Sequence, residues 1–210
     1  SHPLKPVRLR YTHQLLQAYG AFKVPQVEII KPRLVTQEEL RWYHTLEYIE
    51  MVERLDQNPT LPEQIQFGFG SGDNPAYHGI YQAMALSTGA SLVGAELIAS
   101  GEADSAHSIS GGLHHAMPAK ASGFCVFDDP VIAIKSLQKS GFKVAYIDID
   151  CHHGDGVQHA FYDTDEVLTI SVHESGEFLF PGTGFVDEIG IGKGVGYSVN
   201  LPLYPYTCLL

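Results

Sequence analysis

One short stretch, VAYIDIDCHHGDG at residues 144–156, constrains this chain more than any other. An apolar, strand-like segment at 144–147 leads directly into carboxylates, imidazoles and glycines. Because side chains alternate along a strand, Asp148, Asp150 and His152 are expected to project from the same face. The carboxyl ends of parallel strands are where α/β proteins bind their ligands. Carboxylates and an imidazole this close together are stabilised by a cation, so the stretch predicts a divalent metal site.

Strand and helix patterns alternate along the rest of the chain. Helices are predicted over residues 8–19, 36–55, 76–100, 129–139 and 156–162, and strands over 27–30, 106–110, 143–149 and 167–172. Thr36 and Glu39 have the spacing of a capping box, and Asp129 is expected to cap the helix that Pro130 opens. The alternation predicts a single α/β domain over 1–210, with an open, mostly parallel sheet flanked by helices.

Composition narrows the class of partner. The 210 residues are 44% hydrophobic and carry a net charge of −11, which favours a buried core and argues against nucleic-acid binding. No apolar run approaches a membrane span and no leader opens the chain, so a membrane partner is not expected. The three cysteines, Cys125, Cys151 and Cys208, are odd in number and have no CxxC spacing, which favours a reducing compartment and the cytoplasm.

A second cluster of imidazoles follows another predicted strand. His114 and His115 come directly after two glycines, and at a neighbouring strand end they can reach Asp148 and Asp155. A histidine beside a buried carboxylate is held in one tautomer and becomes more basic, as a general base requires. Tandem histidines are otherwise often surface residues, and aromatic loop residues such as Phe124 usually cap a core. Their alternative use is as the wall of a narrow apolar channel.

With these residues together, the chain resembles the zinc-dependent histone deacetylase family, most closely its bacterial acetoin-utilisation-type members. The matching segments are His2-Pro3 with Pro6 and Arg8, Gly111–Ala116, Ala121–Cys125, Asp148–Val157, Phe161-Tyr162, Ser171–His173 and Phe180–Gly184. They follow the family's order over nearly the whole chain. The resemblance implies an arginase/deacetylase-type fold that is incomplete at the C-terminus.

The resemblance also implies a role for individual residues. Zinc, with Fe²⁺ as the other suitable metal, would be held by Asp150 and His152. The implied catalytic residues are His114 and His115, paired with Asp148 and Asp155 respectively. The implied substrate-binding residues are Gly123, Phe124 and Phe180 around a tunnel for an acyl-lysine stem, and Asp73 at its rim. Potassium would bind at Asp148, Asp150, His152, Ser171 and Val172, and at carbonyls around Phe161, Thr164 and Val167.

The implied reaction is metal-assisted amide hydrolysis, in which His115 takes a proton from water and an imidazole then protonates the leaving lysine amine. The family's third zinc ligand, an Asp, and its oxyanion-stabilising Tyr would lie beyond Leu210. The chain also opens at Ser1 without Met, so it is expected to be a fragment. The full-length protein is therefore expected to be a deacetylase, and the 210 residues alone to be inactive or nearly so.

Three alternatives stay open at this point. One is a non-catalytic module that binds acyl-lysine, and another is a deacetylase of acetylpolyamines or other small acyl-amides. A third is a ureohydrolase with two manganese ions, although the carboxylates of Asp150 and Asp155 are one residue too far apart for its DxHxD signature. Charge does not separate protein from small-molecule substrates, because an acidic surface attracts cations of either kind. The oligomeric state is not predicted.

Overall fold

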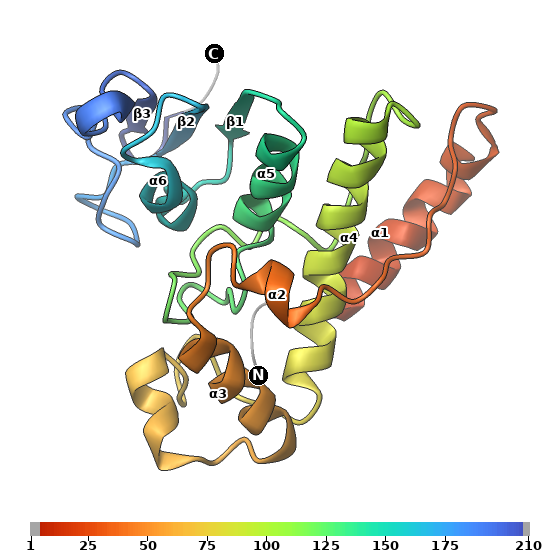
Figure 1. Ribbon diagram of the computed structural model, residues 1–210, viewed down its shortest axis with the longest axis horizontal. Coiled ribbons are helices and arrows are strands. Elements are labelled where there is room, and N and C mark those ends of the chain that lie inside the picture. Colours follow the sequence, from red (N-terminus) through yellow and green to blue (C-terminus); the bar gives the residue numbers. More distant parts are fainter. Residues whose placement is uncertain (1–4, 208–210) are drawn as a thin grey trace.

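The computed structural model describes residues 5–207, so His2-Pro3, Cys208 and Leu210 lie outside the described part (Figure 1). Its sheet consists of three parallel strands in the order β1 (Val144–Asp148), β2 (Val167–Glu174) and β3 (Ser198–Leu203). The register sets Asp148 opposite Ser171, and Thr169 opposite Ser198. The predicted open parallel sheet is confirmed.

Helices flank this sheet and extend away from it. They are α1 (Val7–Ala18), α2 (Gln37–Leu40), α3 (Leu46–Gln57), α4 (Ile80–Ser100), α5 (Asp129–Lys139) and α6 (Asp155–Phe161), with 3-10 turns η1 (Ala21–Lys23), η2 (Pro62–Phe67) and η3 (Gly192–Gly194). Figure 1 shows α5 and α6 beside the strands, and α5 contacts β1, α6 and α4. Helix α4 also contacts α3, so α4 and α5 connect the sheet to the helical half of the molecule.

Two of the hydrophobic clusters in the described structure join the helices and the sheet. The larger one lies around α3 and α4, where the fully buried Tyr48 donates its hydroxyl hydrogen to the Val126 carbonyl over 2.7 Å. The smaller one joins α5, α6 and the sheet through Val131, Val157 and Val167. On the other face of the sheet, apolar side chains of β1 and β3 are exposed. Helices α5 and α6 therefore pack against β1 and β2.

Two predicted strands are wrong. Residues 27–30 and 106–110 have strand-like sequences, but neither segment is a strand in the described structure. Residues 27–30 are all exposed, and no neighbouring strand supplies the hydrogen bonds that a ladder needs. Conversely, β3 was not predicted, since Pro202 and the preceding glycine-rich loop hide its pattern.

The single helix predicted over residues 36–55 is also wrong, because α2 and α3 are separate. The capping box of Thr36 and Glu39 is present, but α2 ends after one turn. Thr45 then caps α3, and its own amide donates to the Pro118 carbonyl over 2.8 Å. Similarly, the N-cap of α5 is Asp128 and not Asp129, since the Asp128 side chain accepts the Val131 amide.

Helix α4 corrects the expectation that no apolar run reaches the length of a membrane span. Its 21 residues are long and apolar enough to cross a membrane, by length and composition alone. A core helix of a water-soluble protein passes the same test, and α4 packs on α3 and α5. The small residue Gly89 is buried on this helix and lies against the backbone of Arg33.

We predict that Gly89→Ala lowers the free energy of unfolding by about 1–3 kcal/mol, because the added methyl group would overlap the Arg33 carbonyl oxygen. Gly94→Ala is the matched control on the same helix. Its methyl group would stand 3.1 Å from the Cβ of the exposed Ala106, which can move, so helix propensity makes this change neutral or stabilising by up to ~1 kcal/mol. Urea unfolding of both variants measures the difference, and equal effects would contradict this packing.

Candidate active site

The loop before the paired histidines is anchored by a buried carboxylate at the start of α5. Asp129 accepts the backbone amides of Gly112 and Leu113 over 3.1 and 2.8 Å, and the Ser91 hydroxyl over 2.5 Å. Gly111 passes so close to this carboxylate that a Cβ there would overlap it. The anchor joins α4, α5 and the loop, and it fixes where the next two residues stand.

Both histidines are buried and each contacts one carboxylate. His114 and His115 are 6% and 4% exposed, and their ring centroids lie 4.0 Å apart. His114 Nδ1 lies 2.6 Å from Asp148 Oδ2, and His115 Nδ1 lies 2.7 Å from Asp155 Oδ1. The structure thus brings together the two pairs that the resemblance implies. In each pair Nδ1–H donates to the carboxylate, which leaves Nε2 for chemistry.

The electrostatics of the first pair favour an ion pair. Burial lowers the pKa of His114, but the hydrogen bond and the negative charge of Asp148 outweigh it and raise the pKa overall. Burial raises the pKa of Asp148, and its hydrogen bonds to His114 and Tyr146 lower it below the usual range. The Tyr146 hydroxyl donates to Asp148 Oδ2 over 2.7 Å. Sequence reasoning did not identify this role of Tyr146, although its position two residues before Asp148 puts both on one strand face.

The second pair is fixed through the first turn of α6. Asp155 is the first residue of this helix, and the next amide, that of Gly156, donates to the His114 carbonyl over 2.9 Å. The Tyr43 hydroxyl donates to the Gly156 carbonyl over 3.0 Å. The histidine segment and the start of α6 are therefore hydrogen-bonded to each other directly.

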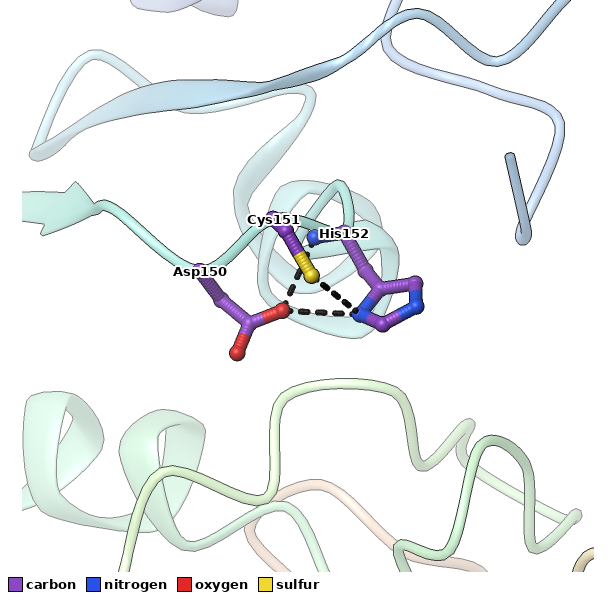
Figure 2. A group of neighbouring side chains, drawn as sticks. All are labelled: Asp150, Cys151 and His152. Atoms are coloured by element: carbon purple, nitrogen blue, oxygen red, sulfur yellow. Dashed lines mark hydrogen bonds and ion pairs between the residues drawn. The ribbon is translucent and has the colours of Figure 1, made fainter. Parts of the chain in front are cut away.

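The candidate metal donors lie just beyond β1, on the loop that leads to α6 (Figure 2). Asp150 Oδ1 is 2.9 Å from His152 Nδ1, and Cys151 Sγ is 3.3 Å from the same nitrogen. All three donor atoms lie within 4.8 Å of one another. The side chains of Asp150 and His152 are 51% and 34% exposed, so this site is open to solvent. The donor set of carboxylate oxygen and imidazole nitrogen fits Zn²⁺ or Fe²⁺.

This arrangement differs in two ways from the strand predicted from the sequence. The strand ends at Asp148, whose side chain turns to His114, so the common face expected for Asp148, Asp150 and His152 does not form. The reason is local, because Asp148 Oδ1 accepts the Asp150 amide over 3.0 Å and so bends the chain at the strand end. The structure also adds Cys151 as a nearby donor. Burial and the Asp150 carboxylate raise the pKa of the Cys151 thiol.

Aromatic and glycine residues stand over the histidines. The Phe180 ring centroid is 4.9 Å from that of His115 and 6.2 Å from that of His152. A Cβ on Gly123 would stand 2.5 Å from His115 Cδ2 and 2.9 Å from Phe180 Cε1, so only glycine fits here. Phe124 follows with a backbone φ of 70°. Gly123, Phe180 and His115 therefore meet at one place, beside the metal donors.

Asp73 is the residue predicted to lie at the rim of the substrate tunnel. It is an exposed residue of the loop between η2 and α4, and its role at a substrate rim stays a prediction.

The residues predicted to bind potassium lie on two segments of the sheet region. Ser171 is opposite Asp148 in the strand register, and its Oγ lies 2.8 Å from His173 Nδ1. Val172 follows Ser171 in β2. At the other segment, the Thr164 amide donates to the Phe161 carbonyl over 3.4 Å, in the turn that leads to Val167 at the start of β2. Potassium binding at both segments stays a prediction.

His44 is a buried residue that sequence reasoning missed. Its Nδ1 lies 3.1 Å from the Met117 carbonyl, and its Nε2 accepts the Asp128 amide over 3.0 Å. These partners fix the neutral Nδ1–H tautomer. Burial lowers the pKa of His44 to about 4, against the weaker opposing effect of its backbone partners. His44 thus ties the segment after the paired histidines to the start of α5, through contacts that no local sequence pattern reveals.

Comparison with known proteins supports this fold. The sequence matches the family model of the histone deacetylase domain over residues 2–208. It is 43% identical over 208 residues to the acetoin utilization protein AcuC of Bacillus subtilis, covering 98% of this chain and 53% of that protein. It is 45% identical over 205 residues to human histone deacetylase 1, covering 96% of this chain and 42% of that protein.

Solved structures give the same result. A histone deacetylase homologue from Aquifex aeolicus superposes with a TM-score of 0.82 at 39% identity, over 90% of this chain and 52% of that one. A complex of such a homologue with SAHA gives a TM-score of 0.81. The chain therefore belongs to the histone deacetylase family. It spans about half the length of the curated relatives it matches.

We predict that Asp150→Asn and His152→Ala each weaken zinc binding at least about tenfold, because each would remove one of the two expected ligands. Cys151→Ser is the matched control between them. We expect it to change zinc affinity less than either, since a thiolate beside Asp150 would put two negative charges side by side. Competition with a chromophoric chelator measures all three affinities. A larger loss for Cys151→Ser would make the thiol a principal ligand and contradict this assignment.

A second prediction concerns acid stability. The folded-state pKa of His44, about 4, is below its unfolded value of 6.5, so its contribution is complete above pH 6.5 and is lost as pH falls toward 4. Across that interval the loss is on the order of 3 kcal/mol. His44→Phe should be less stable at neutral pH, because two backbone groups lose their partners. Its stability should fall less steeply with acid, as measured by urea unfolding at several pH values; a parallel fall would contradict a neutral buried His44.

Proposed function

We propose that the protein that carries this domain is a zinc-dependent hydrolase that removes acetyl groups from acetyl-lysine. The observation that carries the proposal is the pair of buried histidine–aspartate contacts beside the donor atoms of Asp150 and His152. The His115 and His152 ring centroids are 5.7 Å apart, so a base and a metal-bound substrate group can meet. Membership of the histone deacetylase family supports the same reaction class.

In the proposed mechanism, Asp150 and His152 would hold zinc, which would supply Lewis acidity toward the acyl carbonyl and a water molecule. His115 is oriented by Asp155, which holds its Nδ1, so His115 Nε2 is the atom that takes the water's proton. His114 is held in the same way by Asp148. One ring of the pair then returns the proton to the lysine amine as the C–N bond breaks.

The surroundings of the histidines suit an aliphatic acyl-lysine stem. The rings of Phe180 and His115 are in edge contact, and Gly123 packs closely against both. With Phe124, these residues would form the apolar wall of a channel whose rim includes Asp73. The net charge of −11 would attract cationic substrates, which include acetylated proteins rich in lysine and acetylpolyamines.

Further ligands belong to the same proposal. Catalytic zinc sites usually have three protein ligands, so a donor in addition to Asp150 and His152 is required. Potassium at Asp148, Ser171 and Val172, and near Phe161, Thr164 and Val167, would stabilise the strand ends. A cytoplasmic location is also proposed, since Cys125 and Cys151 are free thiols.

The test is acetate release from an acetyl-lysine peptide by the purified, zinc-loaded full-length protein that carries this domain. We predict that His115→Ala lowers kcat on the order of a hundredfold or more, because it removes the general base. His159→Ala is the control, since His159 is an exposed histidine of α6 outside the two pairs. Peptide binding without acetate release would support a non-catalytic acyl-lysine binder instead. Faster turnover of acetylpolyamines than of peptides would change the substrate class.

A further inference from the structure

Asp128 is a buried carboxyl group without a counter-charge. It is 0% exposed, and among residues 5–207 it takes part in no salt bridge. Its Oδ1 accepts the Val131 amide over 3.0 Å and so caps α5. Its Oδ2 is buried and has no hydrogen-bond partner in the described part of the chain. An ionised carboxylate oxygen that is buried without a donor would lower the free energy of unfolding. The protonation state of Asp128 therefore matters for stability.

Asp128 Oδ2 and two backbone carbonyl oxygens lie around the same point beside Gly156. A Cβ on Gly156 would stand 2.6 Å from Asp128 Oδ2, 2.6 Å from the Ala116 carbonyl oxygen and 2.6 Å from the His114 carbonyl oxygen. Three oxygens thus converge on the bare face of Gly156. Carbonyl and carboxylate oxygens are all acceptors, so they repel one another unless one carries a proton. The His114 carbonyl already accepts the Gly156 amide, which makes the Ala116 carbonyl the natural partner for such a proton.

Negative charges dominate the electrostatic surroundings of Asp128. The ionisable groups that interact with it are Tyr43, His44, Cys125, Tyr146, Asp129, Asp148 and Asp155. The imidazole among them, His44, is neutral because burial lowers its pKa to about 4. Burial raises the pKa of Asp128 well above its usual range, and the negative charges of Asp129, Asp155 and Asp148 add to this against the Val131 amide.

The other three aspartates differ from Asp128 because each has either an imidazole partner or a donor at both oxygens. Asp148 and Asp155 contact His114 and His115. In Asp129 each oxygen accepts a backbone amide, Oδ2 from Gly112 and Oδ1 from Leu113. Among these four clustered carboxyl groups, Asp128 is therefore the one that gains most from a proton.

We propose that Asp128 is held as a neutral carboxylic acid whose Oδ2–H donates to the Ala116 carbonyl and positions the histidine segment against the start of α6. Asp128 is a positioning residue, since it acts on His114 and His115 through the backbone. The effect of Asp128 on catalysis rests on the proposed function. The protonation of Asp128 does not depend on that function and can be measured without any substrate.

The test compares two isosteric changes at the same end of α5. Asp128→Asn keeps an oxygen for the Val131 amide and supplies N–H where the proposed O–H stands. Asp129→Asn is the matched control, because whichever oxygen the amide nitrogen replaces, one backbone amide loses its acceptor. Urea unfolding of the 210-residue chain is expected to give Asp128→Asn a midpoint at pH 8 at or above that of the parent. The midpoint of Asp129→Asn should be lower.

The dependence on pH has a definite sign. The folded-state pKa of Asp128 lies above its unfolded value of about 4, so the parent loses stability as pH rises above that value. The unfolding constant of the parent relative to Asp128→Asn should rise by up to about tenfold per pH unit, until the folded-state pKa is reached. Asp128→Asn has no such titration.

Two spectroscopic measurements complete the test. The infrared C=O band of a protonated carboxyl group should be present in the parent at neutral pH and be lost in Asp128→Asn. Asp128→Leu should shift the ring-nitrogen NMR signals of His114 and His115, and Asp128→Asn should leave them in place.

The proposal is overturned if Asp128→Asn is less stable than the parent at pH 8 or fails to fold. It is also overturned if the infrared band is absent, since Asp128 is then ionised. None of these outcomes depends on deacetylase activity.

Discussion

The candidate site depends on how buried carboxyl groups share the hydrogen-bond donors at the carboxyl end of β1. Asp129 binds the loop before the paired histidines, while Asp148 and Asp155 each hold one imidazole. A buried carboxylate is stable only with such partners, so the loop, the strand end and the start of α6 are fixed relative to one another. The same contacts aim both Nε2 atoms away from the carboxylates, as proton transfer requires.

Much of this was predictable from the sequence because the signals are local. The stretch from Val144 to Gly156 encodes a strand, a polar turn and a helix in that order, and the structure has all three. Strands that depend on distant partners were not predictable. Residues 27–30 have a strand-like composition but no neighbour to pair with, whereas β3 has a weak pattern and a full ladder with β2. Pairing, and not propensity, decided both cases.

The candidate site likewise contains residues that the sequence predicted and residues that it did not. The spacing of Asp150 and His152 indicated a metal site, and the resemblance paired His114 and His115 with the correct carboxylates. The supporting residues were not found, because His44 and Ser91 reach the site from segments that have no motif of their own. The sequence did not predict Cys151 as a nearby metal donor. Its distance from His152 Nδ1 depends on how the chain bends after Asp148.

The central claim is that a metal ion binds at Asp150 and His152 beside the two histidine–aspartate pairs. X-ray absorption spectroscopy of the zinc-loaded protein tests it most directly, because ligand type sets the bond length. We expect a first shell of nitrogen and oxygen at about 2.0–2.2 Å with an imidazole contribution. The imidazole contribution should disappear in His152→Ala. A dominant sulfur shell at about 2.3 Å, or a spectrum unchanged by His152→Ala, would contradict it.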